Sequence, residues 1–243
     1  MNRIAILGSD GSMGKRYQAI LRHINIDAAL FEATNWGQIV TTVGIDGIII
    51  ASPTDCHLEN LREIARLNIP ILCEKPIVQD QRDLNEILEM DLNITMVNQY
   101  AFIDGIDGEG VSYYDYYNTG KDGLEWDCIN IIGLAKGDVF INDKSPIWNC
   151  QINGKKLTLE DVYAGYIKMI HSWQQEPKSN YDYISQAHRK IWEKKYVKGR
   201  HRDTSEIKQQ SVAEQVPHGH KRAVDAGLGD KSRSEVSKLY KQR

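Results

Sequence analysis

Short apolar runs alternate with stretches of helical periodicity through the first hundred residues, and this alternation constrains the fold more than any other feature. The apolar runs have the character of strands over residues 3–7, 27–32, 47–52, 69–74 and 93–100. Apolar residues recur at helical spacing over residues 15–24, 35–43, 56–68 and 83–90. Strands that alternate with helices at this pace predict a doubly wound α/β fold, in which right-handed crossovers join the strands of a parallel sheet.

A glycine-rich loop, GSDGSMG, separates the first predicted strand from the first predicted helix. Its glycines are spaced as GxxGxxG instead of the commoner GxGxxG. Glycine allows the backbone to approach a ligand phosphate closely, and the free N–H groups at a helix start favour an anion. The loop therefore predicts a dinucleotide site of the Rossmann type, formed by Gly8, Ser9, Asp10, Gly11, Ser12, Met13 and Gly14.

Glu32 ends the second predicted strand, 18 residues beyond Gly14. An acidic residue at this place accepts hydrogen bonds from the ribose of an adenosine. The next residues are Ala33, Thr34 and Asn35, so no arginine follows that would accommodate a 2′-phosphate. We expect NAD or NADP as the cofactor, and the pattern favours NAD. A tight glycine turn beside an exposed glutamate is the alternative.

Two motifs follow the glycine loop, ASPTDCH at 51–57 and ILCEKPIV at 71–78. With them, residues 3–100 resemble the Gfo/Idh/MocA oxidoreductases, in which one strand ends in T/S-P-x-x-x-H and the next in Glu-Lys-Pro. The glycine spacing alone is closer to that of dihydrodipicolinate reductases, but the other motifs of that group are not found. The resemblance implies that the nicotinamide side of the cofactor site is formed by Ser52, Pro53, Thr54, Glu74 and Lys75, with His57 close by in a supporting role. A cap or a hydrogen bond within the turn is the alternative for His57.

Lys75 follows the fourth predicted strand, at the edge where an open parallel sheet binds its ligands. The resemblance implies that Lys75 meets both the nicotinamide and the substrate hydroxyl. An ammonium group there polarises the reacting oxygen while hydride moves. Pro76 restricts the backbone of Lys75 to extended conformations and makes a cis peptide bond accessible. A surface Glu-Lys pair after a strand is the alternative.

Residues 101–196 predict a second, smaller α+β domain, separate from the Rossmann domain at 1–100. Strands are expected at 111–118, 138–141, 146–152 and 155–159, and helices at 123–135, 159–173 and 179–193. The strands predict a small antiparallel sheet, with fewer strands than the resemblance implies. The resemblance also implies that this domain closes the cofactor cleft and joins subunits into a homo-oligomer.

The helix at 123–135 departs from the resemblance at one position. Family enzymes carry D-x-x-x-H there, with the histidine as proton acceptor or donor. Asp127 matches the acid, but Ile131 occupies the histidine position, and Asn130 is the nearest polar side chain. Asparagine can fix a water or a substrate hydroxyl. We expect Asp127 and Asn130 to act with Lys75, while a solvated helix acid is the alternative for Asp127.

The net charge of −3 conceals a basic C-terminal segment, because residues 188–243 hold 15 Lys/Arg against 7 Asp/Glu. Residues 197–243 are poor in apolar side chains and predict a flexible tail. We expect this tail to be a solvated extension, and binding of nucleic acid or of an acidic partner is the alternative. The pair His218 and His220 has no cluster of further ligands, so we expect no metal site.

The four cysteines are scattered, with no CxxC pair, and indicate reduced thiols in a cytoplasmic protein: Cys56, Cys73, Cys128 and Cys150. No apolar run has the length of a membrane span or a signal peptide, so we expect no membrane partner.

Together with the glycine loop and Glu32, the resemblance to the Gfo/Idh/MocA oxidoreductases implies an NAD(P)-dependent oxidoreductase. It transfers a hydride between nicotinamide and a secondary alcohol or ketone of a sugar or nucleotide-sugar-like substrate. The absent histidine, the shortened second domain and the basic tail leave a non-catalytic dinucleotide-binding sensor or scaffold as the alternative.

Overall fold

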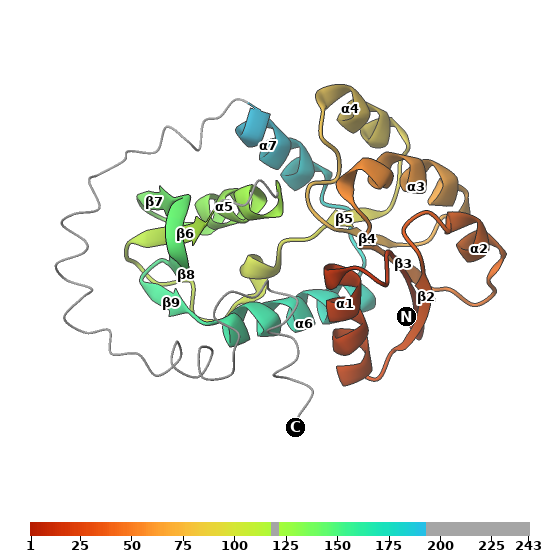
Figure 1. Ribbon diagram of the computed structural model, residues 1–243, viewed down its shortest axis with the longest axis horizontal. Helices are drawn as coiled ribbons and strands as arrows, with labels where there is room; N and C mark the ends of the chain where they lie inside the picture. Colours follow the sequence, from red (N-terminus) through yellow and green to blue (C-terminus); the bar gives the residue numbers. More distant parts are fainter. Residues whose placement is uncertain (118–121, 193–243) are drawn as a thin grey trace. The chain divides into compact units, whose positions relative to one another are not determined.

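The computed structural model describes residues 1–117 and 122–192, in which a five-stranded parallel sheet precedes a four-stranded sheet (Figure 1). The first sheet has the order β2-β1-β3-β4-β5. Its strands are β1 (Arg3–Leu7), β2 (Asp27–Phe31), β3 (Gly47–Ile50), β4 (Ile71–Cys73) and β5 (Ile94–Met96). The helices between them are α1 (Ser12–His23), α2 (Trp36–Thr41), α3 (His57–Ile64) and α4 (Gln81–Glu89). The predicted doubly wound fold is confirmed.

Helices cover both faces of this sheet, which explains why its strands are apolar throughout. On one face, Ile48 and Ile50 of β3 pack with residues of α3 and α4 and with Ile184 of α7 (Tyr181–Trp192). On the other face, Ile49 packs with residues of α1 and with Met169 of α6 (Leu159–Gln175). Successive strand side chains point to opposite faces, so both sides of β3 are buried. The helices α6 and α7, which the sequence pattern placed in the second domain, therefore help to cover the first sheet.

The second sheet has the order β7-β6-β8-β9. Its strands are β6 (Ser112–Tyr117), β7 (Val139–Asn142), β8 (Lys144–Ile152) and β9 (Lys155–Leu157). The prediction of an antiparallel sheet is wrong for β7, which pairs in parallel with β6, whereas β8 and β9 pair antiparallel. The reason is α5 (Asp122–Leu134), a crossover helix between β6 and β7 that returns the chain to the same end of the sheet.

The fifth strand is shorter than predicted. It ends at Met96 because β4 stops at Cys73, whose carbonyl accepts the N–H of Val97 and leaves no partner strand beyond. The chain then forms a 3₁₀ turn over Gln99–Phe102. This turn places Gln99 at the carboxyl edge of the first sheet.

Residues 193–243, which include the predicted flexible tail and the pair His218 and His220, lie outside the described residues. Within the described part, no helix is long and apolar enough to cross a membrane, and no cluster of His, Cys, Asp or Glu is suited to hold a metal ion. The cysteines there are free thiols. The domain boundaries near residues 100 and 196 stay predictions.

Candidate active site

The glycine loop lies between β1 and α1, and packing requires two of its glycines. Gly8 has a φ of +84°, and a Cβ there would lie 2.6 Å from the backbone nitrogen of Ser52. A Cβ on Gly14 would overlap the carbonyl oxygen of Gly8. A Cβ on Gly11, in contrast, would come no closer than 3.4 Å to any atom outside its neighbours. Gly8 and Gly14 therefore fix the shape of the loop, whereas the exposed Gly11, at the start of α1, would accept a Cβ at ordinary contact distance.

This helix start fits the pyrophosphate of a dinucleotide. Gly11 is the N-cap of α1, and no side chain caps the first N–H groups of the helix. Free N–H groups beside open space form a site for an anion. Asp10 and Ser12 are exposed, Ser9 is buried, and Met13 packs partly into the core beneath the loop. The predicted loop residues are thus brought to one helix start.

Glu32 is exposed and lies just beyond β2, beside the glycine loop. The N–H groups of Gly8 and Ser9 both donate to the carbonyl oxygen of Phe31, at 3.0 Å each. These two bonds hold the loop against the end of β2, next to Glu32. Asn35 is 3.5 Å from the Glu32 carboxylate. An exposed carboxylate here can reach a ribose bound over the loop.

His57 connects the two motifs, because each nitrogen of its buried ring contacts a backbone carbonyl oxygen of a different motif. Nε2 lies 2.9 Å from the carbonyl oxygen of Ser52, and Nδ1 lies 3.0 Å from that of Pro76. Burial lowers the pKa of His57, so the neutral ring is favoured. Asn60, one turn along α3, donates to Ser52 Oγ and to the carbonyl of Ala33, at 3.0 Å each. The position expected beside the cofactor therefore links the loops that carry the site.

Pro53 and Thr54 lie between these anchors, where a 3₁₀ turn begins at Thr54. Pro53 is exposed and Thr54 is partly buried. Both lie at the carboxyl end of β3, at the same sheet edge as the glycine loop.

Glu74 and Lys75 follow β4, and the peptide bond between Lys75 and Pro76 is cis. The hydroxyl of Tyr17, on α1, donates to Glu74 Oε1 at 2.5 Å. Burial, with a further contribution from the Glu74 carboxylate, raises the pKa of Tyr17 well above its usual value. Tyr17 therefore remains a hydrogen-bond donor at neutral pH. It ties the glycine-loop helix to the residue before Lys75.

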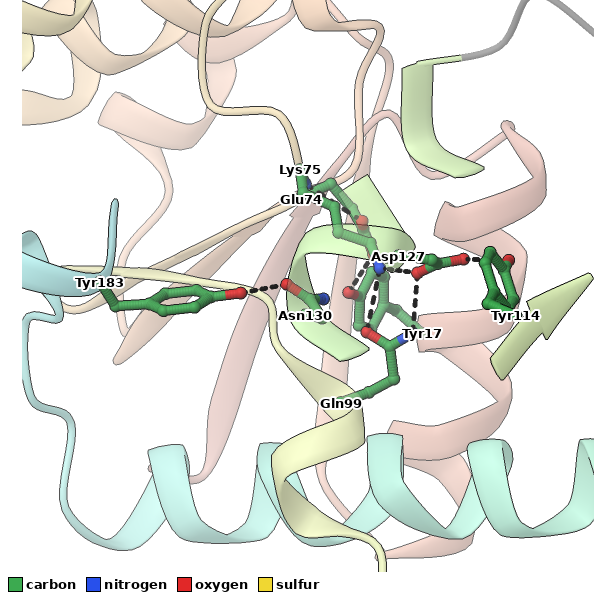
Figure 2. Close-up of polar contacts among 8 residues, drawn as sticks. All are labelled: Tyr17, Glu74, Lys75, Gln99, Tyr114, Asp127, Asn130 and Tyr183. Carbon is green, nitrogen blue, oxygen red and sulfur yellow. Dashed lines mark hydrogen bonds and ion pairs between the residues drawn. The ribbon is translucent and has the colours of Figure 1, made fainter. Parts of the chain in front are cut away.

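Lys75 and Asp127 form a buried ion pair, with side chains only 4% and 3% exposed (Figure 2). The Lys75 ammonium also donates to Gln99 Oε1 at 3.2 Å and lies 5.6 Å from the ring centre of Tyr100. Asp127 accepts further hydrogen bonds from Gln99, at 3.4 Å, and from the hydroxyl of Tyr114, at 3.2 Å. A buried lysine and carboxylate held by shared neighbours can position a proton beside a bound substrate.

Asn130 lies one turn after Asp127 on α5 and is almost fully buried. The hydroxyl of Tyr183, on α7, donates to Asn130 Oδ1 (Figure 2). Asn130 Nδ2 is buried and has no hydrogen-bond partner among the described residues. Ile131, at the position of the expected histidine, packs into the core beneath the second sheet.

Six residues that this site brings together were not predicted from the sequence: Tyr17, Asn60, Gln99, Tyr100, Tyr114 and Tyr183. A signal existed for Gln99, because polar residues that follow a parallel strand lie at the ligand edge of the sheet. Tyr17 and Tyr114 look like apolar-face residues of their elements. Tyr183 comes from a helix far along the chain, where no local pattern indicates a site.

Residues 11–98 match the family model of the Gfo/Idh/MocA oxidoreductases, described as an oxidoreductase family with an NAD-binding Rossmann fold. Over 120 residues the chain is 28% identical to inositol 2-dehydrogenase of Streptomyces avermitilis, a match that covers 49% of this chain and 30% of that protein. Over 40 residues it is 40% identical to the rhizopine catabolism protein MocA of Rhizobium meliloti, covering 16% and 13%. The matches thus span less than a third of each curated relative. The resemblance inferred from the two motifs is confirmed.

Solved structures share the fold over most of the chain. A myo-inositol dehydrogenase from Corynebacterium glutamicum superposes with a TM-score of 0.60 and 13% identity, over 77% of this chain and 93% of that one. The WlbA dehydrogenase from Thermus thermophilus, solved with NAD and UDP-GlcNAcA, has a TM-score of 0.57 and 13% identity, over 78% and 93%. At these identities the likeness shows the fold alone.

Proposed function

We propose that this chain, whose N-terminal part carries the NAD-binding Rossmann fold of the Gfo/Idh/MocA oxidoreductases, is an NAD-dependent oxidoreductase acting on a secondary alcohol or ketone of a sugar-like compound. One observation carries the proposal. A buried Lys75–Asp127 pair lies at the carboxyl edge of the same sheet whose glycine loop fits a dinucleotide. The names of the relatives, an inositol 2-dehydrogenase and a WlbA dehydrogenase, support a polyol or nucleotide-sugar substrate.

The cofactor would be held by the glycine loop and Glu32. The uncapped N–H groups at the start of α1 would bind the pyrophosphate, and the exposed Gly11 would let it approach the backbone there. The Glu32 carboxylate accepts hydrogen bonds from the adenosine ribose and repels a 2′-phosphate, so we propose NAD over NADP. The bound nicotinamide supplies the acceptor or donor of hydride.

Lys75 would hold the proton that accompanies the hydride. In the reducing direction, the carbonyl carbon of the substrate gains a hydride and its oxygen takes one proton from the Lys75 ammonium. In the oxidising direction these transfers run in reverse: Lys75 first releases one ammonium proton to water, and its Nζ then takes the hydroxyl proton as the carbon loses its hydride. Asp127, Gln99 and Tyr114 fix the position of the ammonium group, and Tyr17 fixes the preceding Glu74.

Burial of Lys75 and Asp127 favours a second candidate function, a dinucleotide-binding sensor without turnover. Protein groups already surround the ammonium group, because Asp127, Gln99 and the ring of Tyr100 are its neighbours. A substrate must displace one of these contacts to reach Lys75. In a sensor the ion pair of Lys75 and Asp127 would instead remain closed.

Pairing of subunits through the second sheet and nucleic-acid binding through residues 197–243 stay predictions.

The test separates binding from turnover. The full chain is titrated with NADH and with NADPH while nicotinamide fluorescence is recorded, and NAD is then combined with a panel of polyols and sugars that begins with myo-inositol. We expect tighter binding of NADH than of NADPH, and NADH formation at 340 nm with at least one compound. Binding without turnover on the whole panel favours the sensor. If neither cofactor binds, both candidates are refuted.

A further inference from the structure

Tyr183 reaches the site from α7, which packs against α4 and α5 beside the first sheet. Figure 2 shows its ring extending toward Asn130, and its hydroxyl donates to Asn130 Oδ1. Burial, with a further contribution from the Asp127 carboxylate, raises the pKa of Tyr183. The hydroxyl therefore keeps its proton at neutral pH and can donate it to Asn130 Oδ1, as the hydrogen bond has it.

This hydrogen bond determines how the Asn130 amide is oriented. A primary amide is planar and carries oxygen and nitrogen on opposite sides. With Oδ1 held by Tyr183, Nδ2 is turned away from α7, and in Figure 2 it faces the side of Lys75 and Asp127. Nδ2 is buried without a partner among the described residues. Buried amide donors are nearly always paired with protein, water or a ligand, so this donor is available to an oxygen atom that enters the site.

The donor lies close to the proposed reaction centre. Asn130 follows Asp127 by three residues on α5, and residues at this spacing are neighbours on a helix surface. Asp127 in turn holds Lys75. The site therefore has one charged donor, Lys75 Nζ, which is paired with Asp127 of α5, and one neutral donor, Asn130 Nδ2, about one turn further along α5.

We propose that Asn130 Nδ2 donates a hydrogen bond to the same substrate oxygen that Lys75 polarises, and that Tyr183 positions this donor. The inference rests on the proposed function and adds a residue pair to it. When the carbonyl is reduced, the carbon gains the hydride and the oxygen takes its proton from Lys75, while the N–H bonds of Asn130 stay intact. Asn130 stabilises the negative charge that develops on the oxygen.

The experiment uses the full chain and a compound from the panel that the wild type oxidises with NAD. Asn130→Leu removes the donor at similar volume, and Asn130→Asp keeps the oxygen that Tyr183 contacts while removing the donor. Tyr183→Phe removes only the positioning hydroxyl. Tyr181→Phe is the matched control, because Tyr181 lies on the same helix and its hydroxyl donates to the carbonyl of Leu92.

We expect kcat and kcat/KM to fall together by about 10²- to 10³-fold in both Asn130 variants, as for loss of one oxyanion donor. In Tyr183→Phe we expect a loss of about tenfold, because the amide can rotate away. The Kd for NADH and the melting temperature of Asn130→Leu and Tyr183→Phe should stay near those of Tyr181→Phe, whereas Asn130→Asp should melt at a lower temperature because it buries a second carboxylate near Asp127. In the Asn130→Leu background, Tyr183→Phe should have no further effect, since the hydroxyl acts through the amide.

The inference is overturned if both Asn130 variants retain the wild-type kcat, or if the effects of Asn130→Leu and Tyr183→Phe multiply. If no compound in the panel is oxidised although NADH binds, the proposed function fails and the inference fails with it. That outcome is distinguishable, because the wild type itself is then inactive.

Discussion

Removing one partner of the Lys75–Asp127 pair should destabilise the fold far more than removing a surface ion pair. Asp127→Leu leaves the Lys75 ammonium, whose side chain is 4% exposed, without its carboxylate. Breaking a buried pair in this way costs about 3–5 kcal/mol of the free energy of unfolding. Gln99 Oε1 remains as an acceptor 3.2 Å from Lys75 Nζ, which places the expected loss at the lower end, about 3 kcal/mol.

The double variant Lys75→Met/Asp127→Leu should recover most of this loss, because apolar residues of similar volume replace both charges. We expect it to lie within about 1 kcal/mol of the wild type, so the two substitutions are strongly non-additive. The surface pair of Lys168 and Asp104, whose side chains are 46% and 84% exposed, is the control. Lys168→Met should lower stability by about 1 kcal/mol or less.

The assay is equilibrium unfolding in urea at pH 7 without cofactor, followed by circular dichroism and extrapolated linearly to water. A loss for Asp127→Leu no larger than that for Lys168→Met would refute the reasoning. Such a result would mean that water reaches Lys75 and Asp127 in the free protein, so that the closed pair does not describe the resting site.

Three further predictions concern the loop, a buried histidine and a helix cap. Gly11→Ala should weaken NADH binding in a fluorescence titration and leave the melting temperature almost unchanged, whereas Gly14→Ala should reduce both, because its Cβ overlaps backbone. Burial lowers the pKa of His57, so the unfolded chain binds more protons than the folded chain between that pKa and about 6.5. The free energy of unfolding should therefore fall as pH drops below about 6.5, and His57→Gln should flatten this dependence by up to about 1.4 kcal/mol per pH unit. The exposed His171→Gln is the control, and an unchanged slope in His57→Gln would contradict the assignment. Thr158→Ala removes the capping box of α6 and should cost about 1 kcal/mol in urea unfolding; a loss below a few tenths would refute the cap's contribution.

The first sheet was predicted well because each of its strands and helices is specified by the pattern of its own residues. Each strand is a short apolar run, and each helix has apolar residues at helical spacing, so the order of elements follows without knowledge of contacts. The parallel direction of β7 was missed. Its four residues do not specify in which direction the strand runs beside β6. The helix before it carried that information, since a crossover of this length implies parallel neighbours.

The position of a candidate site residue was predictable where the residue follows a strand and unpredictable where it comes from another element. Lys75 and Glu32 could be placed because the carboxyl edge of a parallel sheet is defined by sequence order. Tyr17 and Tyr183 could not, because each reaches the site through packing of a helix against the sheet. Asn130 was predicted as a site residue because it is the polar side chain nearest to the expected histidine position. Only the structure shows that its Oδ1 is bonded to Tyr183 and that its Nδ2 has no partner among the described residues.

The central claim is that Lys75 controls the proton in a hydride transfer supported by NAD. The most direct measurement is the initial rate of NADH formation at 340 nm, with saturating NAD and myo-inositol or another oxidised compound of the panel, for the wild type and for Lys75→Met. We predict a steady rate for the wild type and, since general acid–base catalysis supplies about 10²- to 10⁴-fold, a loss of that size in the variant with an unchanged Kd for NADH. An equal rate in Lys75→Met would contradict the claim.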